Sequence, residues 1–416
     1  MNEFRKRSKP WPRWPRVSEK GLSEVSDSLL RGRWTVTGGW TGRPCKEREF
    51  ANQFALYHQI PFCVPTCNGT SALVTALEAL DIGFGDEVII PGLTWVANAT
   101  AVLRVNAVPV LVDIEPQTLC MSADALSAAI TPRTRAICVV HLYSCMADMD
   151  AILAIAARHG LPVIEDCAQA HGSRWADGKM AGTLGRIGAF SFQEGKVLTS
   201  GEGGAVLTAD MDIATRLEQL RADGRVYRGQ RGIGEMELAD VGSVQGSNFC
   251  LNEIAATLLL DGLARLDSEN DARERAASSL DNQLQQLTGI RTIQCDARQT
   301  RRTYYQYVVR VDTERLHMDD VSSISAALRD LLNFPVGVAY PPLNQTKLYK
   351  PATKASARIS AEYLEQIDLG KYTLPVAELA HRQCLTFPHW LLLGDDEDLR
   401  DVVRAFEHVW ERLDLQ

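Results

Sequence analysis

The stretch SFQEGKVLTSGEGGA, from Ser191 to Ala205, places a lysine between an apolar segment and a glycine-dense loop. Lys196 is unusual there, because buried strands avoid an unpaired ammonium and loops favour small polar residues. A lysine held in a pocket can lose its proton and condense with an aldehyde. Upstream, the run VIEDCAQAHGS from Val163 to Ser173 predicts an apolar strand that ends in a carboxylate. A lysine for a Schiff base and an acid for a pyridinium nitrogen are the two protein groups that pyridoxal phosphate needs, so we predict an enzyme of the aminotransferase kind.

Around this stretch, apolar runs of strand length alternate with amphipathic runs of helix length. The predicted strands are Glu87–Pro91, Val108–Val112, Ala136–Val140, Pro162–Glu165, Ile187–Phe192 and Ala205–Thr208. Helical periodicity covers Ser71–Leu80 and Asp148–Gly160. Short apolar strands with helices between them predict an α/β fold, with a mostly parallel central sheet covered on both faces. Ligands of such sheets bind at the carboxyl ends of the strands, where Trp95, His141 and Asp166 stand.

The pattern changes after about Ala264. Residues 266–287 predict a long charged helix, Thr303–Val311 an alternating strand, and Asp319–Leu332 a further helix. Apolar positions from Leu399 to Val409 recur at helical spacing, which is typical of a docked C-terminal helix. We therefore predict two domains. Residues 1–264 would form an N-terminal arm and a large cofactor-binding domain, and residues 265–416 a smaller α+β domain.

The composition is that of an ordinary globular protein, with 45% hydrophobic and 23% charged residues and a net charge of −8. A negative chain without a strong basic block argues against a general nucleic-acid surface. No apolar run reaches the roughly 18 residues that a membrane span needs. The N-terminus is basic but has no apolar core, so it is not read as a secretory signal. We expect a cytoplasmic protein that acts on small molecules.

Two further features concern cysteines and the first residues. The ten cysteines include no CxxC pair, and no His/Cys cluster follows Cys63 and Cys67, so a zinc site is not predicted. Reduced, buried thiols are the expected state. The N-terminal segment contains Trp11, Trp14 and three prolines, which favour an extended arm packed on another surface, such as that of a partner subunit. A loose tail is the alternative.

Residues of three further segments could complete a cofactor site. Gly69, Thr70 and Ser71 stand where a helix begins, and a helix N-terminus with hydroxyl side chains suits a phosphate, although a plain helix cap is the alternative. Trp95 follows a strand and could stack on a pyridine ring or pack in the core. Gln169 and His171 lie just beyond Asp166, and either could contact the hydroxyl of that ring.

Taken together, these stretches resemble the DegT-type sugar aminotransferases, which have pyridoxal-phosphate fold type I. The similarity runs in order through NGTSAL, PGLTW, EDCAQAHGS, GAFSFQEGKVLTSGEGGA and QGSNFCLNE. The resemblance implies that Lys196 binds pyridoxal 5'-phosphate and then moves the proton, with pyridoxamine 5'-phosphate as the form that carries the amino group. It implies the remaining contacts as well. They are Asp166 at the pyridine nitrogen, Trp95 on the ring, Gln169 at the hydroxyl, and Gly69, Thr70, Ser71 and Ser191 at the phosphate. Asn248 resembles an asparagine that reaches the phosphate in the partner subunit, which implies a homodimer with shared active sites.

One departure indicates a branch of the family. Many members have an arginine two residues after that asparagine, and Cys250 stands there instead. The cysteine version resembles the branch that transfers the amino group of L-glutamine to a cyclitol ketone, 2-deoxy-scyllo-inosose or scyllo-inosose, in aminoglycoside antibiotic pathways. Two alternatives remain open, because small changes in a pocket redirect its substrate. They are a 3-keto or 4-keto nucleotide-sugar aminotransferase, and a dehydratase like the 3-amino-5-hydroxybenzoate synthases.

Overall fold

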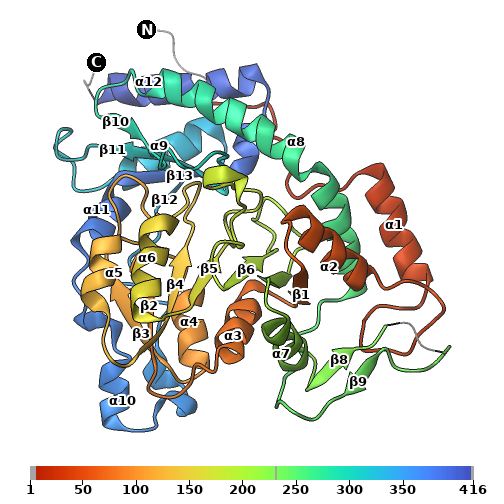
Figure 1. Cartoon of the computed structure of the whole chain (residues 1–416). Coiled ribbons are helices and arrows are strands. Elements are labelled where there is room, and N and C mark those ends of the chain that lie inside the picture. Colours follow the sequence, from red (N-terminus) through yellow and green to blue (C-terminus); the bar gives the residue numbers. More distant parts are fainter. Residues whose placement is uncertain (1–5, 230–231, 414–416) are drawn as a thin grey trace.

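A seven-stranded sheet forms the centre of the computed structural model, which describes residues 6–229 and 232–413 (Figure 1). The strand order is β1-β7-β6-β5-β4-β2-β3. Strands β6, β5, β4, β2 and β3 are parallel to one another, whereas β7 pairs antiparallel with both β6 and β1. The bounds are β1 Phe62–Thr66, β2 Glu87–Pro91, β3 Val108–Val112, β4 Thr134–Val140, β5 Val163–Asp166, β6 Ile187–Ser191 and β7 Gly204–Thr208. The predicted α/β fold with a mostly parallel sheet is confirmed.

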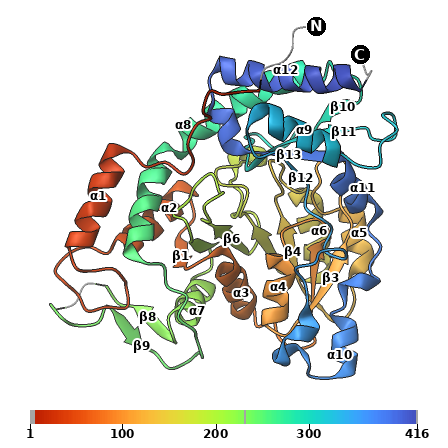
Figure 2. The same cartoon turned by 180° about the vertical axis from the view of Figure 1, so that it is seen from behind.

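Helices cover this sheet (Figures 1 and 2). Every residue of β2, β6 and β7 is buried, so both faces of the sheet are covered. The helices of the first part are α1 Glu19–Leu30, α2 Lys46–Tyr57, α3 Gly69–Ala79, α4 Ala97–Arg104, α5 Ala123–Ala129, α6 Met149–His159 and α7 Met211–Arg221. A two-stranded hairpin, β8 Arg225–Tyr227 with β9 Leu238–Asp240, follows α7.

A second, antiparallel sheet has the order β10-β11-β13-β12 and its own apolar core. Its strands are β10 Ile290–Thr292, β11 Gln306–Val311, β12 Gly337–Val338 and β13 Cys384–Pro388. The accompanying helices are α9 Ser322–Leu332, α10 Ala361–Gln366, α11 Pro375–Gln383 and α12 Asp396–Arg412. Helix α8, Glu253–Leu284, runs without a break between the two sheets and gives side chains to both cores. The predicted division at residue 264 lies inside α8 and stays a prediction, and residues 1–5, 230–231 and 414–416 of the two predicted domains lie outside the described residues.

The structure corrects the expectation that the cysteines are reduced. Cys145 and Cys295 form a disulfide, with their Cα atoms 5.2 Å apart. These residues are 150 positions apart, and no local pattern brings them together. The other eight cysteines are free.

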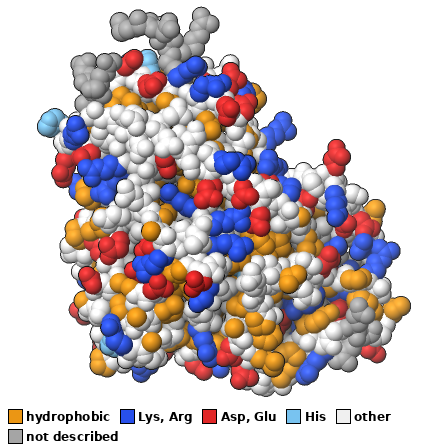
Figure 3. All heavy atoms as spheres, turned by 45° about the horizontal axis from the view of Figure 1, so that its top comes forward, with side chains coloured by type: hydrophobic (Ala, Val, Ile, Leu, Met, Phe, Trp, Pro, Cys, Tyr) orange, Lys and Arg blue, Asp and Glu red, His pale blue; other side chains and the backbone are white. Residues whose placement is uncertain are grey.

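The predicted arm packs against its own chain. Residues 6–16, which we call the arm, cross the second core and approach the loop that carries Lys196, through contacts described below. Acidic and basic side chains are interspersed over the face shown in Figure 3. Within residues 6–229 and 232–413, no helix is long and apolar enough to cross a membrane.

Candidate functional site

A cavity of about 790 Å³ opens at the carboxyl ends of the parallel strands. Eight of the nine predicted cofactor residues line it: Gly69, Thr70, Ser71, Trp95, Asp166, Gln169, Ser191 and Lys196. These residues come from segments far apart in the sequence. They meet because parallel strands present their carboxyl ends at one edge of the sheet. Asn248 is exposed and lies outside this cavity, although its neighbour Phe249 lines it.

Asp166 is the last residue of β5, and its carboxylate is held on both oxygens. Asn98 Nδ2 donates to Oδ2 over 2.8 Å, and the backbone N–H of Ala168 donates to Oδ1 over 2.9 Å. The side chain is buried, with 6% of the residue exposed. The two donors fix the orientation of this carboxylate, which can hold a cation or a protonated nitrogen in the cavity.

The first turn of α3 lies against the end of β6. Asn68 caps the helix by accepting from the backbone N–H of Ser71 over 2.8 Å and from its hydroxyl over 3.0 Å. A Cβ placed on Gly69 would lie 2.5 Å from Cβ of Ser191, so only glycine allows this approach. The result is a cradle of helix N–H groups and hydroxyls from Thr70, Ser71 and Ser191. Such an arrangement suits a phosphate.

We expect Gly69→Ala to damage this cradle. The added methyl group must push α3 away from Ser191, which should cost about 1–3 kcal/mol of folding stability and weaken cofactor binding at least about tenfold. Titration of the apoprotein with pyridoxal phosphate, followed by absorbance, measures the second effect. Gly83→Ala is the matched control, because a Cβ there meets nothing within 4 Å. Equal affinities for the two variants would contradict the assignment of the cradle.

Lys196 lies on the loop after β6, with only 8% of the residue exposed. Its Nζ lies 4.1 Å from the centre of the Tyr305 ring, and the hydroxyl of Tyr340 donates to that of Tyr305 over 3.4 Å. Burial raises the pKa of Tyr305, but the Lys196 ammonium and the hydrogen bond from Tyr340 outweigh it and bring the pKa below its ordinary value. Burial raises the pKa of Tyr340 well above its ordinary value. The lysine therefore faces one phenol that responds to its charge, Tyr305, which is hydrogen-bonded to a second, Tyr340.

Two more predicted residues line the cavity, Gln169 and Trp95. Gln169 Oε1 accepts from the backbone N–H of Tyr143 over 2.7 Å, so its amide nitrogen is the group left to donate into the cavity. Trp95 is half exposed, and its ring lies 5.7 Å from that of Tyr340. An aromatic side chain exposed in a cavity is available to stack on a flat ligand.

Three histidines, His141, His171 and His389, are buried and do not line the cavity. His141 Nε2 bonds Glu165, and His389 Nδ1 accepts from Arg273 Nε. His171 Nε2 donates to the carbonyl oxygen of Ser191 over 2.9 Å. Burial lowers the pKa of His171 to about 3, so its ring is neutral and supports the backbone of β6. Of the two residues proposed at the ring hydroxyl, only Gln169 therefore reaches the cavity.

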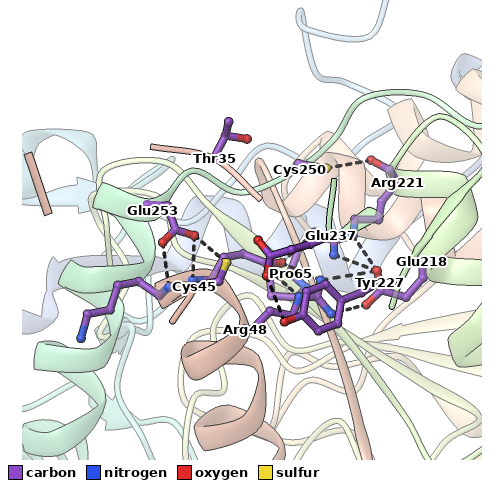
Figure 4. A network of polar contacts seen from close by, with 12 residues as sticks. Thr35, Cys45, Arg48, Pro65, Glu218, Arg221, Tyr227, Glu237, Cys250 and Glu253 are labelled. Carbon is purple, nitrogen blue, oxygen red and sulfur yellow. Dashed lines mark hydrogen bonds and ion pairs between the residues drawn. The ribbon is translucent and has the colours of Figure 1, made fainter. Parts of the chain in front are cut away.

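Cys250 lies at the edge of a buried network of ion pairs (Figure 4). Its Sγ donates to the carbonyl oxygen of Arg221, and burial raises its pKa to about 12, so the thiol stays protonated. Arg221 is fully buried and pairs with Glu47 and Glu218, each over 2.7 Å. A buried charge without a partner is costly, so this network ties α2 firmly to α7 beside Asn248.

A family model matches residues 23–407 of this chain. The chain belongs to the DegT/DnrJ/EryC1/StrS aminotransferase family. This membership confirms the predicted aminotransferase and fold type I, and it agrees with the motif order around Lys196.

Members of this family with known names are similar over nearly the whole chain. An L-glutamine:2-deoxy-scyllo-inosose aminotransferase from Micromonospora echinospora is 49% identical over 406 residues, covering 97% of this chain and 95% of that protein. An L-glutamine:scyllo-inosose aminotransferase from Streptomyces griseus is 47% identical over 407 residues, with coverages of 98% and 96%. Among solved structures, 3-amino-5-hydroxybenzoic acid synthase aligns with a TM-score of 0.82 at 29% identity, covering 98% of this chain and 100% of that chain.

Sequence reasoning missed several residues of this DegT-family site. Tyr305, Tyr340 and Arg104 line the cavity, and Asn98 holds Asp166. The strings RTYYQYVVR and YPPLN contain both tyrosines, but a tyrosine in a strand or loop pattern says nothing about which cavity it faces. Asn98 follows Trp95 on the same turn, which was the only local signal for it.

Proposed function

We propose that this protein is a pyridoxal-phosphate-dependent aminotransferase that moves the amino group of L-glutamine to the ketone of a cyclitol, 2-deoxy-scyllo-inosose or scyllo-inosose, in an aminoglycoside-type pathway. The observation that carries the proposal is one cavity that holds Lys196 and Asp166, in a chain 47–49% identical to enzymes named for those substrates. The high coverage means that this similarity extends over nearly the whole chain.

The described residues fit this cofactor. The cradle at Gly69 has no room for a side chain and offers donors for a phosphate, and the fixed carboxylate of Asp166 is the matching partner for a pyridine nitrogen. Trp95 supplies an exposed aromatic face, and Gln169 supplies a donor. Pyridoxal phosphate, when bound, supplies an aldehyde that condenses with amines and a ring that withdraws electrons from the reacting carbon.

Each residue then has one task. Lys196 Nζ would hold the cofactor and, as a free amine, would carry a proton to and from the substrate carbon. Asp166 keeps the ring nitrogen protonated, and Asn98 keeps Asp166 in place. Thr70, Ser71 and Ser191 hold the phosphate. Tyr305 and Tyr340 close the side of the cavity next to Lys196 and shield the proton transfer from water.

We propose further that the active form is a homodimer in which Asn248 completes the partner's site. Asn248 is exposed beside the ion-pair network, while the adjacent Phe249 lines the cavity of its own chain. The Oδ1 atom of Asn248 accepts from the backbone N–H of Cys250 over 3.3 Å, which leaves its amide nitrogen free to reach outward. Sites shared between subunits would make activity depend on protein concentration.

A cyclitol fits the cavity better than a nucleotide sugar. Of the described residues that line the cavity, Arg104 is the only cation besides Lys196, and it is exposed at the rim. A nucleoside diphosphate would call for more positive charge. The dehydratase alternative corresponds to the structure of 3-amino-5-hydroxybenzoic acid synthase. That protein is 29% identical to this chain, whereas the cyclitol aminotransferases named above are 47–49% identical.

A panel of ketones with L-glutamine as the amino donor tests this proposal. We expect turnover with 2-deoxy-scyllo-inosose, scyllo-inosose or both, and activity at least about 100-fold lower with a nucleotide 4-keto sugar, since the unmatched diphosphate must be desolvated. Rates would be followed by formation of the oxo-acid from glutamine. Activity on the nucleotide sugar alone would overturn the cyclitol assignment.

A further inference from the structure

The arm is anchored along the second core. The guanidinium of Arg7 is buried and forms ion pairs with Asp398 and Asp401 of α12. Trp11 Nε1 donates to the carbonyl oxygen of Leu332 over 2.8 Å, and its ring lies 4.9 Å from that of Phe334. These contacts fix the course of the arm before it reaches the cavity side of the molecule.

The arm then touches the loop that carries Lys196. Trp14 Nε1 donates to the carbonyl oxygen of Glu194 over 2.9 Å, two residues before the lysine. The Trp14 ring lies edge-on to His389 at 4.4 Å, and the Arg273 guanidinium lies 5.4 Å from the centre of the Trp14 ring. One indole side chain therefore connects the arm, α8 and the loop.

A chain of buried polar groups supports the same loop where it leaves β6, at Ser191. Arg273 donates from Nε to His389 and from Nη1 to Asn270, over 3.1 and 3.0 Å. Asn270 Nδ2 donates to the carbonyl oxygen of His171, whose ring holds the carbonyl oxygen of Ser191. Burial lowers the pKa of Arg273 to about 10, so it remains a cation at neutral pH. The backbone before Lys196 is thus held at two points, at Ser191 by α8 through His171 and at Glu194 by the arm.

We propose that Trp14 is a positioning residue. Through its hydrogen bond to the Glu194 carbonyl, it fixes the position and orientation of Lys196 in the cavity. The turn before the lysine contains Gly195 and is closed by two hydrogen bonds to Gln193, from the Lys196 N–H to its carbonyl oxygen over 2.9 Å and from the Gly195 N–H to its Oε1 over 2.8 Å. A backbone of this kind has freedom to shift, and proton transfer tolerates little displacement of the amine. The inference rests on the proposed role of Lys196.

The test compares Trp14→Phe with Trp11→Phe in the full-length holoenzyme. Each substitution keeps an aromatic ring and removes one indole N–H that donates to a backbone carbonyl, and both tryptophans are half-buried. We expect Trp14→Phe to lower kcat about 3- to 10-fold, the loss that corresponds to one hydrogen bond, with KM for L-glutamine changed less than about twofold. It should also speed hydrogen exchange at the amides of residues 192–200 and alter the pH titration of the visible absorbance of bound cofactor. Trp11→Phe should do none of these.

Equal behaviour of the two variants in kcat, in exchange of residues 192–200 and in the absorbance titration would overturn the positioning role. A change in Trp14→Phe that is accompanied by an equal fall in the unfolding temperature and by faster exchange throughout the chain would also overturn it, because that is general destabilisation. Lys196→Ala separates the two proposals. If that variant keeps its turnover, the proposed function fails, whereas its inactivity together with a silent Trp14→Phe rejects the positioning role alone.

Discussion

Replacing Lys196 with alanine should lower kcat by about 10⁴-fold or more. The side chain is buried, faces the cavity and supplies the only amine among the described lining residues. Its loss removes both the group that holds the cofactor and the group that moves the proton. The same variant should lose the visible absorbance that the lysine gives to bound cofactor. Its unfolding temperature should change little, because Lys196 forms no salt bridge among the described residues. Steady-state turnover and an absorbance spectrum of the purified protein measure both effects.

Lys196→Arg is the matched control for charge. Arginine keeps a cation beside Tyr305, but its guanidinium stays protonated and does not condense with an aldehyde. We expect it to be as inactive as the alanine variant. Turnover in Lys196→Ala near that of the wild type would contradict the assignment of the lysine.

Asp166→Asn should lower kcat roughly 100- to 1000-fold, the range for removing one preorganised electrostatic contact. The amide retains the shape of the carboxylate but cannot hold a proton on a ring nitrogen. It would also place an NH₂ group against either the Asn98 amide or the Ala168 N–H, both of which now donate. The visible spectrum of bound cofactor should change, since it reports the protonation of the ring. Stopped-flow mixing with L-glutamine measures the loss in the first half of the reaction.

Glu165→Gln is the control for loss of a neighbouring buried carboxylate. Glu165 points away from the cavity and accepts from the backbone N–H groups of Gly182, Leu184 and Gly185, as well as bonding His141. We expect that variant to lose about 1–3 kcal/mol of folding stability and to keep the spectrum and the rate of the folded enzyme. If Asp166→Asn left both the spectrum and the rate unchanged, Asp166 would not be the partner of the ring.

The central sheet could be predicted because its strands are short, apolar and buried on both faces. β2 and β3 have the predicted bounds. β1 was missed, because FCVPT contains a proline, which reads against a strand interior. The structure places β1 at the edge of the sheet, where a missing N–H is tolerated. The reversal of β7 was not predicted either, since a buried strand has the same apolar pattern in either direction.

The gathering of Lys196, Asp166 and Gly69 around one cavity could be predicted, because each lies beside a strand end or a helix start. The site was not predictable where function depends on tertiary contacts. Tyr305 reaches Lys196 from the start of the second sheet, and Trp14 reaches Glu194 from the N-terminal arm. Separations of this kind leave no periodic signal, and neither does the ion pairing of Arg221 with Glu47.

The most direct test follows the α-amino nitrogen of L-glutamine into the product. The enzyme would be incubated with 2-deoxy-scyllo-inosose and L-glutamine that carries ¹⁵N at its α-amine, and the product would be analysed by mass spectrometry. We predict an amino-cyclitol that contains the label and has lost no further water. A dehydrated, aromatic product, or a product without the label, would contradict transamination from glutamine to a cyclitol ketone.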